Sequence, residues 1–432
     1  MDKFIINGGK TLKGEIEVVG AKNAVTPILA ACLLTSEPCV IDNVPLIEDC
    51  FRMLDIFESI GVRVEWLDKR KLRITADNID LQKIDRKLVS KLRSSILLMG
   101  SLSARFKNFK LFQPGGCIIG ARTVEPHIQA LGALGVKVYE KERDYFIERD
   151  ILKGAEVLLN EFSVTATENV LMAAVMANGR TIIKCAAAEP HTQDLCYFLK
   201  KMGAKISGIG THTLTIDGVK KLKGADYFLI YDYIEMGSFL SLAGAVKGKI
   251  LIKNVIPEFI ECELSKFREA NLNFKIKNLR KFSKGWGYKI GNIEVLPSSG
   301  LRAVKKVHNM PYPGLAADFL PPFAAMLTQA EGTSLIHDWM YEGRLQYINE
   351  LNKMGANAVI CDPHRALITG PVPLYGTEIT SYDLRAGAAL IIAALTARGK
   401  SEISEVYQVD RGYEKIEERL LKIGADIERV NI

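Results

Sequence analysis

The sequence predicts an α/β protein built from six related units, which divide into two domains of three units each. Three observations lead to this fold class. An amphipathic helix followed by Gly or Asn and then a strand recurs six times, and apolar helices rich in small residues recur between these copies. A chain of 432 residues also exceeds the size of one ordinary core. Each unit reads as βαβαββ over roughly 70 residues. A solenoid is the alternative, but its repeats are usually shorter and no terminal capping repeats are evident.

The six copies of the recurring pattern share a residue type that favours the left-handed backbone conformation. These pivots lie between 68 and 84 residues apart, at Gly61, Gly135, Gly203, Asn271, Gly355 and Gly424. A helix commonly ends on such a residue before the chain turns into a strand. We therefore expect each pivot to end an amphipathic helix on the outside of its unit.

The second type of helix is apolar nearly all round. Its best examples are residues 165–178, 236–246 and 384–397, closed by Gly179, Gly248 and Gly399. Helices without a polar face are expected to be buried. Short strands such as residues 181–184 and 249–252 lie between the helices. Because ligands often bind between domains, we expect the functional site in the cleft between the two sets of three units.

The composition places the chain among ordinary globular proteins, with 48% hydrophobic and 25% charged residues. The start of the chain shows no signal peptide, and the apolar run at residues 24–34 is too short to cross a bilayer. We therefore expect a cytoplasmic protein without a membrane partner. The net charge of +7 is mild and the lysines are dispersed, which argues against a nucleic-acid partner and suits small anionic substrates.

Several common chemistries lack their motifs in this sequence. The eight cysteines form no Cys-x-x-Cys pair and the six histidines are scattered, so neither a disulfide framework nor a metal site is expected. Residues 8–11 lack the glycine spacing of a phosphate-binding loop, and residues 208–210 lack the third glycine of a dinucleotide fingerprint. Gly-x-Ser-x-Gly is also absent.

A single cysteine in a turn is the strongest candidate for covalent or acid–base chemistry. Cys117 follows Pro-Gly-Gly and precedes Arg122 by five residues. Glycines leave the sulfur accessible, and a nearby arginine favours the thiolate and attracts anions. The alternative is a surface turn with an incidental cysteine.

Charged residues at the starts of apolar helices suggest an anion site. Lys22 precedes Asn23 at the start of one such helix, where a cation opposes the helix dipole but, with the exposed amides, can bind an anion. The alternative is an exposed lysine that only snorkels. Four arginines occupy comparable places, namely Arg93, Arg344, Arg385 and Arg411. Each alone would form a surface salt bridge, but together they favour an oxyanion substrate with more than one charged group.

Asp318 follows Pro-Tyr-Pro-Gly-Leu-Ala-Ala and precedes the apolar pair Phe319-Leu320. It is either a helix N-cap or a general base at the mouth of a cleft.

Taken together, these residues resemble the enolpyruvyl transferases over essentially the whole chain. The matching segments are residues 20–24, 114–122, 383–386 and 410–414, and the Pro-Gly-Gly-Cys loop is similar to that of the branch acting on UDP-N-acetylglucosamine. The resemblance implies an inside-out α/β barrel with helices inside. It also implies that the chain crosses between domains near residues 21 and 230, giving domains of residues 22–230 and of residues 1–21 plus 231–432.

The resemblance further implies the reaction. The enolpyruvyl group of phosphoenolpyruvate would pass to the 3′-hydroxyl of UDP-N-acetylglucosamine, phosphate would leave, and no metal or organic cofactor would take part. A monomer or weak homo-oligomer is implied as well. Cys117 would protonate C3 of phosphoenolpyruvate, and Asp318 would accept the hydroxyl proton or steer the collapse of the tetrahedral intermediate.

The resemblance also assigns binding residues. Lys22, Arg122 and Arg411 would hold the phosphate, while Arg344 and Arg385 would hold the carboxylate. The positions that match contacts to the nucleotide sugar are Asn23, Arg93, Arg122, Thr123, Val124, Glu125, Pro126, Ser163, Val164, Thr165 and Met340.

The chain departs from the usual family residues mainly on the acceptor side. The departures are Glu48 and Glu161 for Lys, Thr165 for Gly, His191 for Glu, Tyr233 for Arg, and Ala317 for Thr. Two alternatives therefore stay open: a transferase with a different nucleotide or nucleotide-sugar acceptor, and a non-catalytic binding homologue.

Overall fold

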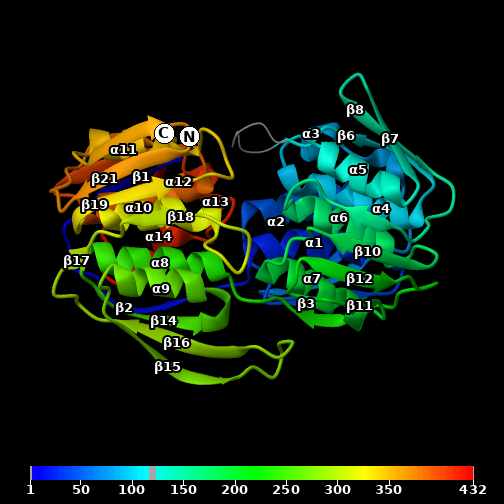
Figure 1. Ribbon diagram of the computed structural model, residues 1–432, viewed down its shortest axis with the longest axis horizontal. Helices are drawn as coiled ribbons and strands as arrows, with labels where there is room; N and C mark the ends of the chain where they lie inside the picture. Colours follow the sequence, from blue (N-terminus) through cyan, green and yellow to red (C-terminus); the bar gives the residue numbers. More distant parts are fainter. Residues whose placement is uncertain (1, 116–122, 432) are drawn as a thin grey trace.

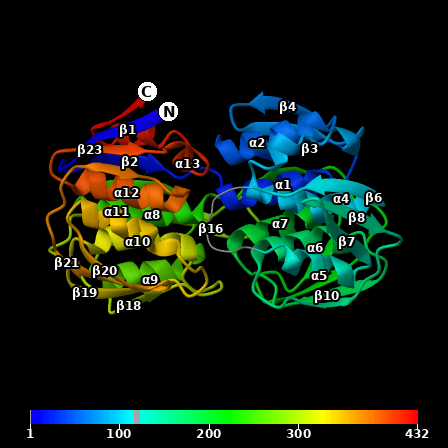
Figure 2. The same ribbon diagram turned by 90° about the horizontal axis from the view of Figure 1, so that it is seen from above.

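The computed structural model describes residues 2–115 and 123–431, so Cys117 and Arg122 lie outside the described residues. Figure 1 shows two lobes, and Figure 2 shows them side by side from above. The blue-to-green helices and strands form one lobe, here called the first lobe. The green-to-red elements form the second lobe together with the first two strands of the chain. The α/β fold class is confirmed.

Among the described residues, the first lobe contains three small sheets. In strand order they are β13 (Asp226–Phe228), β3 (Cys39–Asp42), β5 (Lys71–Thr75) and β4 (Arg63–Asp68); β11 (Lys205–Ser207), β12 (Thr213–Asp217), β10 (Arg180–Lys184) and β9 (Glu156–Leu158); and β6 (Asn108–Phe112), β8 (Asp144–Arg149) and β7 (Val136–Lys141).

The second lobe also contains three sheets. In strand order they are β22 (Glu378–Thr380), β23 (Lys400–Ser404), β1 (Asp2–Asn7) and β24 (Ile427–Asn431); β15 (Phe274–Lys281), β16 (Lys289–Val295), β14 (Lys249–Val255) and β2 (Lys13–Glu17); and β17 (Leu301–Arg302), β19 (Ala330–His337), β21 (Arg365–Gly370) and β20 (Asn357–Asp362), with β18 (Lys306–His308) also paired to β19.

Five of these sheets share one pattern of strand directions. A parallel pair, such as β2 with β14 or β22 with β23, joins an antiparallel pair through its second strand. In the sheet β22-β23-β1-β24, β1 is antiparallel to both β23 and β24. The start of the chain therefore completes a sheet formed by its end. Within the described residues no sheet closes into a barrel, and the inside-out barrel stays a prediction.

The six pivots adopt the backbone conformation that the sequence predicts. The φ angles are 87° at Gly61, 91° at Gly135, 109° at Gly203, 60° at Asn271, 97° at Gly355 and 95° at Gly424. Most of the helices before them keep an exposed face, as their burial patterns show. These and the other outer helices are α2 (Glu48–Ser59), α3 (Arg86–Val89), α5 (Glu125–Ala133), α7 (Pro190–Lys201), α9 (Glu261–Glu269), α11 (Tyr347–Lys353), α13 (Tyr407–Asp410) and α14 (Ile416–Leu421).

The apolar helices are buried, as expected. They are α1 (Lys22–Cys32), α4 (Leu98–Arg105), α6 (Val164–Ala174), α8 (Tyr233–Ala245), α10 (Leu320–Leu327) and α12 (Leu384–Thr396). Every residue of α8 is buried. After α8 the left-handed position is Lys247 (φ 51°) rather than the expected Gly248. In the part of the chain that the structure describes, the helical set also includes five 3₁₀ turns: η1 (Leu81–Lys83), η2 (Arg93–Leu97), η3 (Pro257–Phe259), η4 (Ala317–Phe319) and η5 (Arg344–Gln346).

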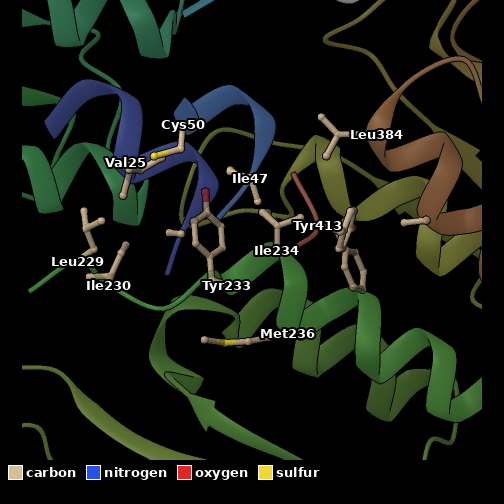
Figure 3. Packing of buried hydrophobic residues seen from close by; sticks show 14 of the residues in the cluster. Val25, Ile47, Cys50, Leu229, Ile230, Tyr233, Ile234, Met236, Leu384 and Tyr413 are labelled. Carbon is tan, nitrogen blue, oxygen red and sulfur yellow. The ribbon is translucent and has the colours of Figure 1, made fainter. Parts of the chain in front are cut away.

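Gly237 allows η4, the turn that contains Asp318, to pack closely against α8. A Cβ atom at Gly237 in α8 would lie 2.7 Å from the ring of Phe319 in η4, so the ring packs directly on the helix backbone. Figure 3 shows Tyr233 and Ile234 of the same helix packed near Val25, Leu384 and Tyr413. The starts of helices from both lobes therefore meet in one buried cluster.

Among the contacts between the lobes, two lie near the point where the chain crosses from one to the other. Where the chain passes between them, Gly20 pairs with Tyr231 in an isolated bridge, and the Ala21 amide donates to the Ile230 carbonyl at 2.8 Å. Close to this crossing, the tip of the β15–β16 hairpin reaches α7 through Trp286 and Asp194, and Asp194 also accepts from the Ile230 amide. Among the described residues, no helix combines the length and apolar character needed to span a membrane.

Candidate active site

A cleft between the lobes collects side chains from the starts of helices on both sides. Its cavity volume is about 240 Å³. The charged and polar residues that line it are Lys22, Asn23, Thr26, Asp49, Arg93, Ser94, Thr165, Glu168, Glu189, His191, Tyr233, Glu263, Tyr312, Asp318, Tyr341, Arg344 and Arg411. The cleft is therefore a strongly charged site rather than an apolar ligand pocket.

Asp318 lies between two buried arginines. Its Oδ1 accepts a hydrogen bond from Nη2 of Arg344 at 2.6 Å, and its Oδ2 accepts one from Nε of Arg385 at 3.1 Å. Burial alone would raise the pKa of Asp318, but the two guanidinium groups outweigh it and hold the pKa well below its usual range. Asp318 is thus an ionised carboxylate, fixed in orientation by both arginines.

The two arginines keep further donors available. Among the described residues, Nε and Nη1 of Arg344 and Nη1 and Nη2 of Arg385 are buried and have no hydrogen-bond partner. A buried donor without a partner costs about 1–3 kcal/mol, and more for a charged group. Two adjacent guanidinium groups with such donors suit a bidentate oxyanion such as a carboxylate.

A second ion-pair cluster surrounds Asp49 near the start of α2. Its Oδ1 accepts from Nε of Arg411 at 3.0 Å, and its Oδ2 lies 3.4 Å from Nζ of Lys22. Burial opposes ionisation of Asp49, but Lys22 and Arg411 together lower its pKa. Asp49 therefore holds two cations from different lobes side by side in the cleft.

Three carboxyl groups in the cleft have the opposite tendency. Burial is the main reason why the pKa values of Glu168 and Glu189 are raised, and it raises that of Glu263 to about 7. The charge of Glu189 also raises the pKa of Glu168. Among the described residues none of the three forms an ion pair like those of Asp318 and Asp49, and at Glu168 the charge of Lys22 offsets burial only in part, so these groups favour the protonated form.

The sequence of the chain agrees with a known family over almost its whole length. The sequence profile described as EPSP synthase (3-phosphoshikimate 1-carboxyvinyltransferase) matches residues 6–420. The chain belongs to this family of enolpyruvyl transferases. It is 41% identical to the UDP-N-acetylglucosamine 1-carboxyvinyltransferase of Treponema denticola, with 99% of each chain covered. It is 42% identical to UDP-N-acetylglucosamine 1-carboxyvinyltransferase 1 of Clostridium acetobutylicum, with 100% of each chain covered.

Solved structures of the family share the fold. The enolpyruvyl transferase NikO from Streptomyces tendae superposes with a TM-score of 0.87 at 23% identity, covering 99% of each chain. EPSP synthase from Acinetobacter baumannii gives a TM-score of 0.75 at 20% identity, covering 100% of each chain. Both similarities concern the enolpyruvyl transferase fold.

Most of the binding residues expected from the sequence meet in the cleft of this family member. Those that line it are Lys22, Asn23, Arg93, Val164, Thr165, Asp318, Met340, Arg344 and Arg411. Arg385 does not line the cavity but reaches it through Asp318. Ser163 is the N-cap residue of α6 beside the cleft. Residues 123–126 lie at the start of α5 and do not line the cavity.

The departures from the usual family residues occupy two kinds of place. Glu48 and Glu161 are exposed and do not line the cavity, and Glu48 lies 3.7 Å from Arg52 in an i,i+4 pair. Thr165, His191, Tyr233 and Ala317 do line it. Of the departures, only the four that line the cavity alter the wall of the cleft.

Sequence reasoning missed Asp49, Glu168, Glu189 and Glu263 as cleft residues. Asp49 stands in the first helical turn, where an acidic residue is common for the helix dipole alone. Glu168 stands inside an apolar helix, and a carboxylate there was the one available signal.

Among the described residues, no group of three or more His, Cys, Asp or Glu is arranged to hold a metal ion. The expectation of catalysis without metal or cofactor stays a prediction.

Proposed function

We propose that the protein transfers the enolpyruvyl group of phosphoenolpyruvate to the 3′-hydroxyl of UDP-N-acetylglucosamine and releases phosphate. This is the first committed step of peptidoglycan synthesis. One observation carries the proposal: two separate groups of cations flank a fixed carboxylate in a single cleft of an enolpyruvyl transferase. Full-length relatives at about 40% identity that bear the name of this activity support the acceptor.

The two cation groups match the two charged ends of phosphoenolpyruvate. Lys22 and Arg411, held by Asp49, offer charge for the phosphate, with Arg122 as a third expected member. Arg344 and Arg385, with their unpaired donors, offer a bidentate partner for the carboxylate. Fixed cations at both ends leave C2 between them, next to Asp318.

The chemistry is an addition followed by an elimination. The acceptor oxygen forms a bond to C2 while its proton passes to Asp318, and Cys117 donates a proton to C3. In the second step the bond between C2 and the phosphate oxygen breaks and phosphate leaves, C3 returns a proton to the Cys117 thiolate, and the enolpyruvyl ether remains. Asp318 is ionised and oriented for the first transfer, because both its oxygens accept from arginine.

We further propose the domain division into residues 22–230 and residues 1–21 plus 231–432, with each domain an inside-out barrel of three units. The bridge between Gly20 and Tyr231 and the pairing of β1 and β2 with second-lobe strands support it. We also propose that the protein is cytoplasmic and that it is a monomer or a weak homo-oligomer.

The direct test is phosphate release from phosphoenolpyruvate in the presence of UDP-N-acetylglucosamine. We expect release that depends on the nucleotide sugar and is lost in Arg385→Ala. The exposed Arg365→Ala variant, in the same lobe but outside the cleft, serves as the control. No release, together with turnover on another nucleotide, would overturn the acceptor. Ligand binding by calorimetry without any turnover would favour a non-catalytic homologue.

A further inference from the structure

His191 and Tyr233 form a neutral pair that joins the lobes inside the cleft. His191 is the second residue of α7 in the first lobe, and Tyr233 is the first residue of α8 in the second. Nδ1 of His191 lies 3.1 Å from the Tyr233 hydroxyl, and the rings are stacked with centroids 6.1 Å apart. Each residue is only 4% exposed, and both line the cavity. Neither has a role in the function proposed above.

The surroundings decide which nitrogen of His191 carries the proton. Burial lowers the pKa of His191 to about 3, so the imidazole is neutral and has a single N–H. Burial also raises the pKa of Tyr233, so its hydroxyl keeps its hydrogen. Within the described residues the only hydrogen-bond partner of that hydroxyl is Nδ1 of His191. The hydroxyl therefore donates to Nδ1, because otherwise a buried O–H would lose its partner at a cost of about 1–3 kcal/mol.

This tautomer places the N–H of His191 on Nε2, which has no protein partner among the described residues. The charges of Asp318 and Lys22 both act on His191, in opposite directions. His191, Asp318 and Lys22 all line this cleft, so a ligand bound in it can meet all three side chains.

We propose that His191 is a further substrate-binding residue, whose Nε2–H donates a hydrogen bond to the acceptor hydroxyl, and that Tyr233 is the positioning residue that fixes this tautomer. The inference rests on the proposed function and assigns one of its contacts. A hydroxyl has one hydrogen to donate and two lone pairs. Its hydrogen goes to Asp318, and a lone pair accepts from His191.

A neutral donor suits this place better than a charged one. A third cation beside Asp318, in addition to Arg344 and Arg385, would compete with the acceptor hydroxyl for the carboxylate, and an anion would repel the phosphate held by Lys22. The family resemblance leads one to expect Glu at position 191 and Arg at position 233. An ionised Glu at position 191 donates no hydrogen bond, so those two residues cannot make the contact that His191 makes here. The pair therefore gives this chain its own contact to the acceptor.

The tautomer can be observed directly by nitrogen-15 NMR of protein labelled at histidine, without any turnover. The chain has six histidines, and the signals of His191 are those lost in His191→Gln. We expect a protonated Nε2 and an unprotonated Nδ1 in the wild type, and a mixture of tautomers in Tyr233→Phe. A wild-type signal with the proton on Nδ1, or an unchanged signal in Tyr233→Phe, would overturn the inference.

Substrate binding provides the second test. Loss of one neutral hydrogen bond weakens binding by roughly 10-fold. We expect His191→Phe to raise the KM for UDP-N-acetylglucosamine by about that factor and to leave the KM for phosphoenolpyruvate unchanged. His191→Gln, which keeps an N–H near Nε2, should recover most of the loss, and Tyr233→Phe should lie between them. Equal affinities in all four proteins, or a change confined to phosphoenolpyruvate, would refute the contact.

The same contrast separates this inference from the proposed function. If the wild type binds UDP-N-acetylglucosamine in calorimetry but releases no phosphate, the catalytic proposal fails while the binding contrast still decides the role of His191. Thermal melting of each variant shows whether a loss of binding reflects a loss of folding.

Discussion

Nε1 of Trp286 donates a hydrogen bond to Oδ1 of Asp194 at 2.8 Å, which ties the tip of the β15–β16 hairpin in one lobe to α7 in the other. The same carboxylate accepts from the Tyr227 hydroxyl at 2.6 Å and from the Ile230 amide at 3.2 Å. Lys284 at the hairpin tip adds an ion pair with Asp42 at 3.4 Å. The lobes are thus fastened together at a fully buried carboxyl group, three residues along α7 from the cleft-lining His191.

The buried position of Asp194 predicts a pH-dependent stability. Burial outweighs the three donors and raises its pKa from 3.8 to about 7. Because the folded state binds the proton more tightly, its contribution to stability is present below pH 4 and lost as the pH rises to about 7, by on the order of 4 kcal/mol. Chemical unfolding between pH 4 and 8 should show this fall in the wild type and a flatter curve in Asp194→Asn. The exposed Asp226→Asn should keep the wild-type slope, and an equal slope in Asp194→Asn would contradict the assignment.

Asp318 predicts a separation of binding from chemistry. Asp318→Asn keeps the size of the side chain but removes the proton acceptor, so kcat should fall by about 100-fold or more. Binding of phosphoenolpyruvate should persist, because Arg344 and Arg385 remain. Steady-state kinetics combined with calorimetry measures both quantities. Since arginine holds the pKa of Asp318 well below its usual range, the acidic limb of the wild-type pH profile should not come from this group. An unchanged kcat in the variant would exclude Asp318 as the base.

For Asp49 we expect the opposite of Asp318: a substitution should weaken the binding of phosphoenolpyruvate more than it slows the reaction. It positions Lys22 and Arg411 without reaching the reacting atoms in the proposed chemistry. Asp49→Asn removes the charge that holds both cations, so the KM for phosphoenolpyruvate should rise by about 10-fold, while kcat changes less. Stability should also fall by roughly 3–5 kcal/mol, because two partly buried cations lose their counter-charge. Glu58→Gln on the exposed face of the same helix is the control. A larger effect on kcat than on KM would show that Asp49 acts in the chemistry.

The sequence could predict those features that depend on neighbours along the chain. The left-handed pivots and the buried helices follow from local residue types, and the positions of Lys22 and Asp318 at the starts of such helices follow as well. The pairing of Asp318 with Arg344 and Arg385 spans 26 and 67 residues, and that of Asp49 with Arg411 spans 362. Such pairs form only when distant parts of the chain pack together, so no periodicity in the chain reveals them. The same holds for the buried link between Asp194 and the hairpin.

Glu161 predicts a gain of acceptor affinity on substitution. It is exposed, and its carbonyl accepts from the amide of Ser163, the N-cap residue of the cleft-lining helix α6. Glu161→Lys would bring a cation toward Ser163 and Val164, two positions expected to contact the nucleotide sugar, whose diphosphate is anionic. The KM for UDP-N-acetylglucosamine should fall by about 2- to 5-fold at low salt and less at high salt, because screening weakens exposed charges. Glu378→Lys, exposed in the other lobe, should change nothing. A higher KM in Glu161→Lys would place the diphosphate elsewhere.

Substitution of Cys117, which lies outside the described residues, tests the proposed proton donor directly. A serine hydroxyl is a far weaker acid than a thiol, so Cys117→Ser should lose at least about 100-fold in kcat if the side chain protonates C3. Covalent labelling by a thiol-directed epoxide such as fosfomycin should vanish at the same time. Cys361→Ser is the matched control, because Cys361 is an exposed thiol that does not line the cleft. Mass spectrometry of labelled protein locates the adduct. If labelling persists in Cys117→Ser and disappears in Cys361→Ser, the reactive thiol is not the proton donor, because an accessible sulfur alone explains the adduct.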